Sequence, residues 1–167
     1  MTTETREDAG DREGETNLEG VEIQRVDSRD GIPGWTSFDE IALFLHEKMQ
    51  PYHDTLEDVK RGLDYALSDE PGQGGFMVVS AVEDRLAGAV VFLETGMKGY
   101  VPGTLLLFVC VDPDLRGRGL GRRIIESGLR TIDGQVKLHV EPDNPARRLY
   151  ERIGFTNKYL EMRWDRP

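Results

Sequence analysis

The chain has 167 residues and carries 31 acidic against 21 basic side chains, a net charge of −10. This length is typical of one domain that closes a core without disulfides, and the single cysteine, Cys110, excludes an internal disulfide framework. No apolar stretch approaches the roughly twenty residues that a membrane helix requires, and the N-terminus lacks the apolar centre of a signal peptide. We therefore expect a cytoplasmic protein without a membrane partner.

Half of the net charge lies at the N-terminus. Residues 1–20 hold seven acidic residues and two arginines, a net of −5, and almost no apolar side chains that could be buried. A Thr-, Glu- and Gly-rich segment of this kind is typical of disordered chain. We therefore expect an acidic, disordered leader over 1–20 and a single domain over 21–167.

The sequence of the first part of that domain predicts one strand and two helices. Val21–Val26 alternates as a strand does. Ser37 and Glu40 form a capping box, and Pro51 ends the helix that follows it, whose apolar residues are Ile41, Leu43, Phe44 and Met49. Thr55 can cap a second helix, in which apolar residues recur at helical spacing at Leu56, Val59, Leu63 and Ala66.

The second part predicts a strand-rich unit with two further helices. Phe76–Val82 and Leu86–Leu93 form a hairpin around a tight turn, and Leu105–Val111 is the continuous apolar run of a strand buried on both faces. After it we expect a helix from Leu120 to Ile132, a strand from Lys137 to Val140, a helix led by Asn144, and a final pair of strands around Phe155 and Tyr159–Trp164. This order predicts an α+β fold with helices on both sides of the sheet.

A glycine-rich turn follows the buried strand and opens directly into a helical pattern. Gly117, Gly119 and Gly121 leave a ridge without side chains, so that successive backbone N–H groups can converge on an anion. The helix that begins at Leu120 adds the positive end of its dipole. Cationic side chains surround the turn in an otherwise acidic protein: Arg116, Arg118, Arg122 and Arg123. The pattern predicts a site for a diphosphate.

Two familiar phosphate loops do not fit this turn. A dinucleotide fingerprint reads G-x-G-x-x-G, whereas this loop reads G-x-G-x-G, and the P-loop needs a Gly-Lys-Ser or Gly-Lys-Thr that the chain lacks. Arg-Gly segments that bind RNA are repeated and disordered, while this one stands alone between ordered patterns. We therefore expect no nucleic-acid partner.

The turn resembles the acyl-CoA loop of the GNAT superfamily of N-acetyltransferases, R/Q-x-x-G-x-G/A after a strand. A second family signature is matched by Leu138–Phe155, with its strand, its Asn-led helix ending in A-x-x-L-Y and its G-F turn. The resemblance is specific over 104–164 and only compatible over 21–95. It implies an α/β/α sandwich, in which about four helices cover a mixed, mostly antiparallel sheet. It also implies that the strands ending at Val111 and Val140 splay apart to admit the pantetheine arm.

The resemblance assigns the donor site residue by residue. Backbone groups of Cys110 and Val111 should hold the pantetheine amides, with the Val111 N–H as the oxyanion donor. Tyr150 matches the tyrosine that protonates the departing thiolate. The pyrophosphate should be held by Arg116, Gly117, Arg118, Gly119, Leu120, Gly121 and Arg122.

Asn144 stands where the family often places an asparagine near pantetheine. Its position before Pro145 also makes it a helix N-cap, which is a structural reason for the same residue. Many relatives have seven steps between this asparagine and the tyrosine, and here there are six. Either Asn144 or Asp143 can therefore fill that place.

The sequence defines the general base and the acceptor site less closely than the donor site. Leu105–Val111 lacks the glutamate that relatives often use, so Glu94 is the first substitute, with Glu141, His139 or a water chain as alternatives. The acceptor groove of the fold points to Pro51–Asp54, with Tyr52 and His53 as substrate-binding residues. The last hairpin at Asn157–Lys158 and the glycine-rich Thr95–Gly103 are expected as further walls.

Two functions remain from this sequence. The first is an acetyl-CoA-dependent N-acetyltransferase, with no metal, that acts on a primary amine by direct attack through a tetrahedral intermediate. Its acceptor would be a small cationic amine, or a protein N-terminus or lysine, which the acidic charge would attract. The second is an inactive acyl-CoA-binding sensor or interaction module. A longer acyl donor and a homodimer are left open.

Overall fold

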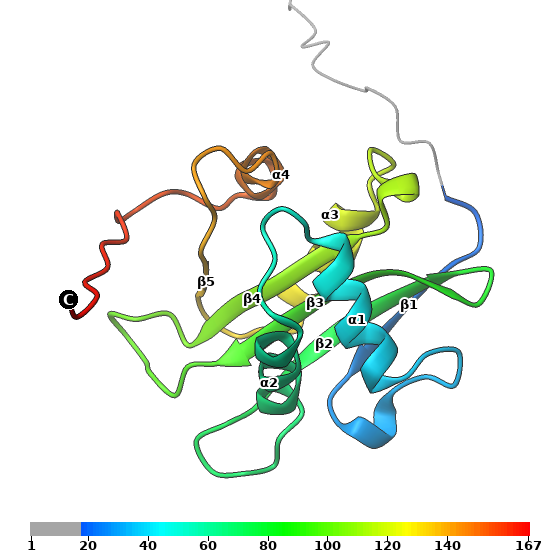
Figure 1. Cartoon of the computed structure of the whole chain (residues 1–167), viewed down its shortest axis with the longest axis horizontal. Coiled ribbons are helices and arrows are strands. Elements are labelled where there is room, and N and C mark those ends of the chain that lie inside the picture. Colours follow the sequence, from blue (N-terminus) through cyan, green and yellow to red (C-terminus); the bar gives the residue numbers. More distant parts are fainter. Residues whose placement is uncertain (1–17) are drawn as a thin grey trace, which may run out of the picture.

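A five-stranded sheet forms the centre of the computed structural model, which describes residues 18–167. Its spatial order follows the chain, with β1 to β4 antiparallel and β5 parallel to β4 (Figure 1). The strands are β1 (Val21–Val26), β2 (Gly75–Val82), β3 (Arg85–Glu94), β4 (Thr104–Val111) and β5 (Val136–Leu138). A mixed, mostly antiparallel sheet is what the sequence predicted.

Four helices cover the sheet, as expected: α1 (Phe38–Lys48), α2 (Leu56–Ala66), α3 (Leu120–Leu129) and α4 (Ala146–Ile153). Short 3-10 turns lie at Arg29–Gly31 and Pro113–Leu115. The Ser37 hydroxyl accepts from the Glu40 N–H at 3.2 Å and the Thr55 hydroxyl from the Asp58 N–H at 3.1 Å, so both predicted caps form. No helix in the described part of the chain is long and apolar enough to cross a membrane.

The helices lie in two layers, one on each face of the sheet (Figure 1). Because side chains alternate along a strand, β2 turns Met77 and Val79 to the α1–α2 layer and Val78 to the α3–α4 layer. Both faces are therefore buried, which is why the strands are apolar almost throughout. A Cβ on Gly128 of α3 would lie 2.3 Å from Cε2 of the buried Phe92, so this close helix approach requires glycine.

β4 and β5 pair over a short stretch and then separate. Their register joins Thr104–Leu106 to Val136–Leu138. Beside the rest of β4, from Leu107 to Val111, residues 18–167 place no strand on the β5 side. This gap lies where the sequence resemblance expected two strands to splay. The predicted strand from Lys137 to Val140 is thus observed as Val136–Leu138.

The predicted final pair of strands is not formed. The Phe155 N–H donates to the Tyr150 carbonyl at 2.9 Å, and within the described residues no backbone hydrogen bond follows it toward the C-terminus. Residues 156–167 have no regular secondary structure and are exposed. A strand forms only with a hydrogen-bonded neighbour, and residues 156–167 have none in the part of the chain that the structure describes.

The leader prediction falls largely outside the described residues, because residues 1–17 are not described. Leu18 is half-buried and packs against the core cluster of the α3–α4 side, and Glu19 and Gly20 form a turn before β1. Among the described residues, packing against the domain therefore includes Leu18, three residues before the predicted domain boundary.

Candidate active site

The glycine turn connects the end of β4 to the first turn of α3. Gly117 and Gly119 adopt left-handed backbone conformations, with φ of +72° and +78°, which glycine reaches without strain. A Cβ at either position would meet nothing within 4 Å, and Gly119, the N-cap of α3, supplies no side-chain cap. The first amide groups of α3 therefore have no side-chain cap, and an anion can bind them.

Gly121 serves a different purpose from the other two glycines. A Cβ there would lie 3.3 Å from Leu149 Cδ2 on α4 and 3.5 Å from Val111 Cγ2 on β4. Its lack of a side chain lets the first turn of α3 close on both elements. The open amides are thus held against the end of β4.

The arginines around the turn divide into engaged and unengaged side chains. Arg116 donates from Nε to the Val111 carbonyl at 3.0 Å and from Nη2 to the Lys48 carbonyl at 2.8 Å, so it joins the end of α1 to the end of β4. Arg122 pairs with Glu126 at 2.7 Å. In the described chain, Arg118 and Arg123 form no ion pair and are exposed, which leaves their charge for a diphosphate.

The ladder between β3 and β4 fixes the direction of the Val111 backbone. Asp112 N–H donates to the Ala87 carbonyl at 2.9 Å, and Val111 stands opposite Gly88. In an antiparallel ladder, only alternate residues exchange hydrogen bonds with the neighbouring strand. The N–H and C=O of Val111 therefore point away from β3 into the gap, as its bond from Arg116 also requires.

The same alternation separates the two residues expected to hold pantetheine. Cys110 stands opposite Ala89 and, one step from Val111, turns its backbone amide toward β3. Its main-chain groups are thus used in the sheet, and we do not retain them as pantetheine ligands. Val109 shares the direction of Val111, so its N–H and C=O also face away from β3, a feature that sequence reasoning did not single out. The sequence of one strand does not indicate which of its residues form backbone hydrogen bonds with a given neighbouring strand.

Tyr150 brings a hydroxyl to this end of the sheet from α4. The side chain is 8 % exposed and packs edge-on against Phe155, with ring centroids 6.0 Å apart. Burial, and then the nearby Cys110 thiol, raise the pKa of Tyr150 to about 12. In the described part of the chain only Thr36 has a fully buried side-chain oxygen without a partner, so the unpartnered Tyr150 hydroxyl keeps contact with solvent.

The Cys110 thiol is a core group. It is buried, and burial raises its pKa to about 11, with the Arg116 guanidinium acting in the opposite direction. At neutral pH it is a protonated thiol and a poor nucleophile. The arrangement therefore offers no thiolate for a covalent acyl-enzyme.

Asn144 caps α4. Its Oδ1 accepts from the Ala146 N–H at 2.9 Å, which satisfies one of the amides that open the helix. The side-chain oxygen is thus engaged, and only the amide nitrogen of Asn144 remains for a ligand. The neighbouring Asp143 turns its carbonyl to the Tyr52 hydroxyl at 3.4 Å.

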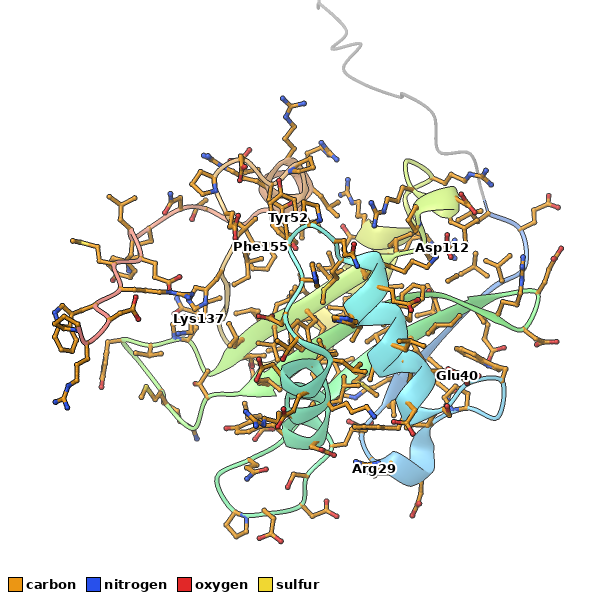
Figure 2. The ribbon with its side chains drawn as sticks, viewed as in Figure 1. Arg29, Glu40, Tyr52, Asp112, Lys137 and Phe155 are labelled. Carbon is orange, nitrogen blue, oxygen red and sulfur yellow. The ribbon has the colours of Figure 1, made fainter. Side chains whose placement is uncertain are left out.

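The Tyr52–Asp143 contact joins the loop between α1 and α2 to the connection between β5 and α4. Figure 2 draws Tyr52 at the tip of its loop. Burial, with Asp143 and Glu141 as further causes, raises the pKa of Tyr52. Next along this loop, His53 packs edge-on against His46 at 5.3 Å. The two residues predicted to bind the acceptor therefore lie on one loop, and Tyr52 reaches the far side of the gap.

The three residues predicted as alternative general bases lie at different places in the structure. Glu94 stands opposite Thr104, six residues along β3 from Gly88, the partner of Val111. At about 3.3 Å per residue this is about 20 Å, so Glu94 cannot reach the Val111 end of the gap and is not retained as the base. His139 lies 4.0 Å from Glu161. Glu141, like Asp143, is close enough to Tyr52 to raise the pKa of that phenol, and of the three predicted bases it is the one beside the proposed acceptor loop.

Comparison with known proteins identifies the family. Residues 73–157 match the model of the acetyltransferase (GNAT) domain, a span that contains the turn, the gap and α4. The chain belongs to the GNAT family. It is 30 % identical over 159 residues to a mycothiol acetyltransferase of Thermobispora bispora, covering 89 % of this chain and 50 % of that protein. A mycothiol acetyltransferase of Geodermatophilus obscurus is 44 % identical over 61 residues, 34 % of this chain and 20 % of that protein.

These curated relatives are longer, and the GNAT chain described here spans half of their length or less. Solved structures agree on the fold. An aminoglycoside N-acetyltransferase in complex with CoA superposes with a TM-score of 0.62 at 14 % identity, over 87 % of this chain and 94 % of that one. A GNAT acetyltransferase of Streptococcus pneumoniae gives 0.61 at 17 % identity, over 87 % and 98 %.

Proposed function

We propose that this chain transfers an acetyl group from acetyl-CoA to the primary amine of a small cationic molecule. The observation that carries the proposal is the junction of β4 and α3. There the open amides of the Gly117–Gly119 turn, the inward-facing N–H of Val111 and the accessible hydroxyl of Tyr150 meet beside one gap. A diphosphate, a thioester carbonyl and a leaving thiolate need these three kinds of group.

Each step of the proposed reaction is assigned to a residue of this chain. The acceptor nitrogen attacks the thioester carbon, and the carbonyl oxygen takes the negative charge, which the Val111 N–H stabilises; one such donor contributes about 3 kcal/mol in other enzymes. The intermediate then expels the CoA sulfur, which receives its proton from Tyr150. With a pKa of about 12, this phenol holds its proton throughout the physiological range. Glu141, directly or through water, removes the proton of the amine.

Support for a small amine comes from charge and from the relatives. The chain has a net charge of −10, which draws cations to it. The proteins it resembles are named for mycothiol and for aminoglycosides, which are small molecules. We therefore place small amines ahead of a protein terminus or lysine as acceptor.

A sensor that binds acyl-CoA without transferring it is the second candidate. One observation favours it: β4 carries no acidic residue, and Glu94 lies at the wrong end of the ladder. Calorimetric titration with acetyl-CoA, followed by a thiol-release assay on aminoglycosides, deacetylated mycothiol, a polyamine and a basic peptide, decides between them. Binding with release for one small amine supports the enzyme. Binding without release supports the sensor, and no binding refutes both.

A further inference from the structure

Positive charge is concentrated on one helix of this acidic chain. Residues 116–130, which cover the glycine turn and α3, hold five arginines and one glutamate, a net charge of +4 in a chain of −10. Arg122 pairs with that glutamate, Glu126, and Arg116 is engaged by two backbone carbonyls. The other three are exposed and, within residues 18–167, form no ion pair; we call them the arginine cluster: Arg118, Arg123 and Arg130.

Two members of the arginine cluster lie on the side of α3 that faces away from α4. Gly121 is the position at which α3 approaches α4. Because each helical residue is turned by about 100° from the one before it, Arg123 and Arg130 lie about 160° and about 180° around α3 from Gly121. On that far side lies β1, since the Arg25 guanidinium donates to the Thr131 hydroxyl just after the helix. Arg123 and Arg130 therefore lie on the β1 side of α3.

The described chain begins on this same side of α3. β1 starts with Val21, opposite Val82 and beside the β2–β3 turn, and β4 ends with Val111 at the same end of the sheet. Leu18 precedes β1 and packs against the core cluster of the α3–α4 side. The chain therefore enters the domain on the α3 face, at the end of the sheet where α3 begins (Figure 1).

The segment that precedes Leu18 carries the opposite charge to the arginine cluster. Residues 1–17 hold six acidic residues and two arginines, a net charge of −4. Seventeen extended residues span at most about 55–60 Å, whereas the ten residues of α3 make a helix about 15 Å long. The acids can therefore reach the whole arginine cluster, and their covalent linkage gives them an effective concentration on the order of millimolar beside it.

We propose that residues 1–17 dock on the arginine cluster of their own chain and there compete with the diphosphate of acyl-CoA. The competition rests on the proposed function, which uses Arg118 and Arg123 for the diphosphate, whereas the docking does not. Both ligands are anions that need the same cationic side chains, so each one displaces the other. Salt screens contacts between exposed charges, so the competition is strong at low ionic strength and is lost at high ionic strength.

The first test detects the docking without any ligand. Cys110 is buried and is the single native cysteine, so the thiol of Gly10→Cys takes a spin label selectively. We expect the label to broaden the NMR signals of the α3 amides at about 20 mM salt and to leave them sharp at about 500 mM. The same label on Asp69→Cys, in the α2–β2 loop, is the matched control and should not broaden them. Sharp α3 signals at low salt, or equal broadening when label and isotope are on separate chains, overturn the proposal.

The second test measures the Kd for acetyl-CoA by calorimetry in two full-length variants. One removes four charges of the segment: Glu7→Gln, Asp8→Asn, Asp11→Asn and Glu13→Gln. Its matched control removes four exposed charges elsewhere: Asp30→Asn, Glu47→Gln, Asp69→Asn and Glu70→Gln. Because exposed ion pairs are individually weak, we expect the first variant to have a Kd about three- to tenfold below that of the unmodified protein at low salt, and an equal Kd at high salt.

The control variant should keep the Kd of the unmodified protein. Equal Kd values for the two variants at low salt overturn the competition. If no protein binds acetyl-CoA, the proposed function and the competition fail together, and the spin label alone decides the docking.

Discussion

The substitution Gly119→Asp tests the anion site at the start of α3. A Cβ at this position points into open space where the diphosphate is proposed to bind, so the new carboxylate would lie beside two negative charges. At about 5 Å and an effective dielectric constant between about 20 and 80, two such repulsions total about 2–7 kcal/mol. We expect the Kd for acetyl-CoA, measured by calorimetry, to rise at least tenfold.

The control for this experiment is Gly119→Asn. Asparagine has the size of aspartate and tolerates the same left-handed backbone, so it carries the backbone cost without the charge. Gly72→Asp adds a second control, because Gly72 has a φ of +85° and open surroundings away from the turn. If Gly119→Asp binds acetyl-CoA as tightly as Gly119→Asn, the turn does not hold the diphosphate.

Three other substitutions test the rest of the site. Tyr150→Phe should lower kcat about 100-fold or more, because the proton donor is lost, with little change in the Kd for acetyl-CoA. The melting temperature should also change little, because the hydroxyl has no hydrogen-bond partner within the described residues. Equal turnover would assign Tyr150 to the core. Arg116→Ala should lower the free energy of unfolding by about 1–3 kcal/mol, because two hydrogen bonds are lost. Arg122→Ala breaks an exposed ion pair and should lower it by less than about 1 kcal/mol. Denaturant titration of both variants measures the difference. Burial raises the pKa of Cys110 from 9.0 to about 11, so the folded state holds this proton more tightly than the unfolded state does. The free energy of unfolding should therefore fall by about 3 kcal/mol as the pH rises from about 9 to 11. The melting temperature of Cys110→Ala should fall less than that of the unmodified protein over the same range.

The local parts of this structure could be predicted because each depends on residues close in sequence. Ser37 and Thr55 cap their helices as their positions indicate. The β2–β3 hairpin turns at Glu83 and Asp84, both with positive φ, where the sequence placed a tight turn. Helices on both faces of a mixed sheet followed from the order of the elements.

Features that depend on distant partners could not be predicted from the sequence. Arg116 was expected to bind pyrophosphate through its side chain, but its guanidinium contacts carbonyls on β4 and on α1, 68 residues away. The roles of Cys110 and Val109 depend on the phase of the β3–β4 ladder, and the position of Glu94 depends on its register. The strand pattern of Tyr159–Trp164 is present in the sequence, but a pattern cannot state which edge it pairs with.

The two hydrogen bonds of Arg116 have a consequence for how the substrates influence each other. One guanidinium ties the last carbonyl of β4, beside the proposed donor turn, to the last residue of α1, where the proposed acceptor loop begins. Neither wall can shift without displacing the same planar group. Occupation of the donor site should therefore stiffen the acceptor side, which favours an ordered sequence in which the nucleotide arrives before the amine.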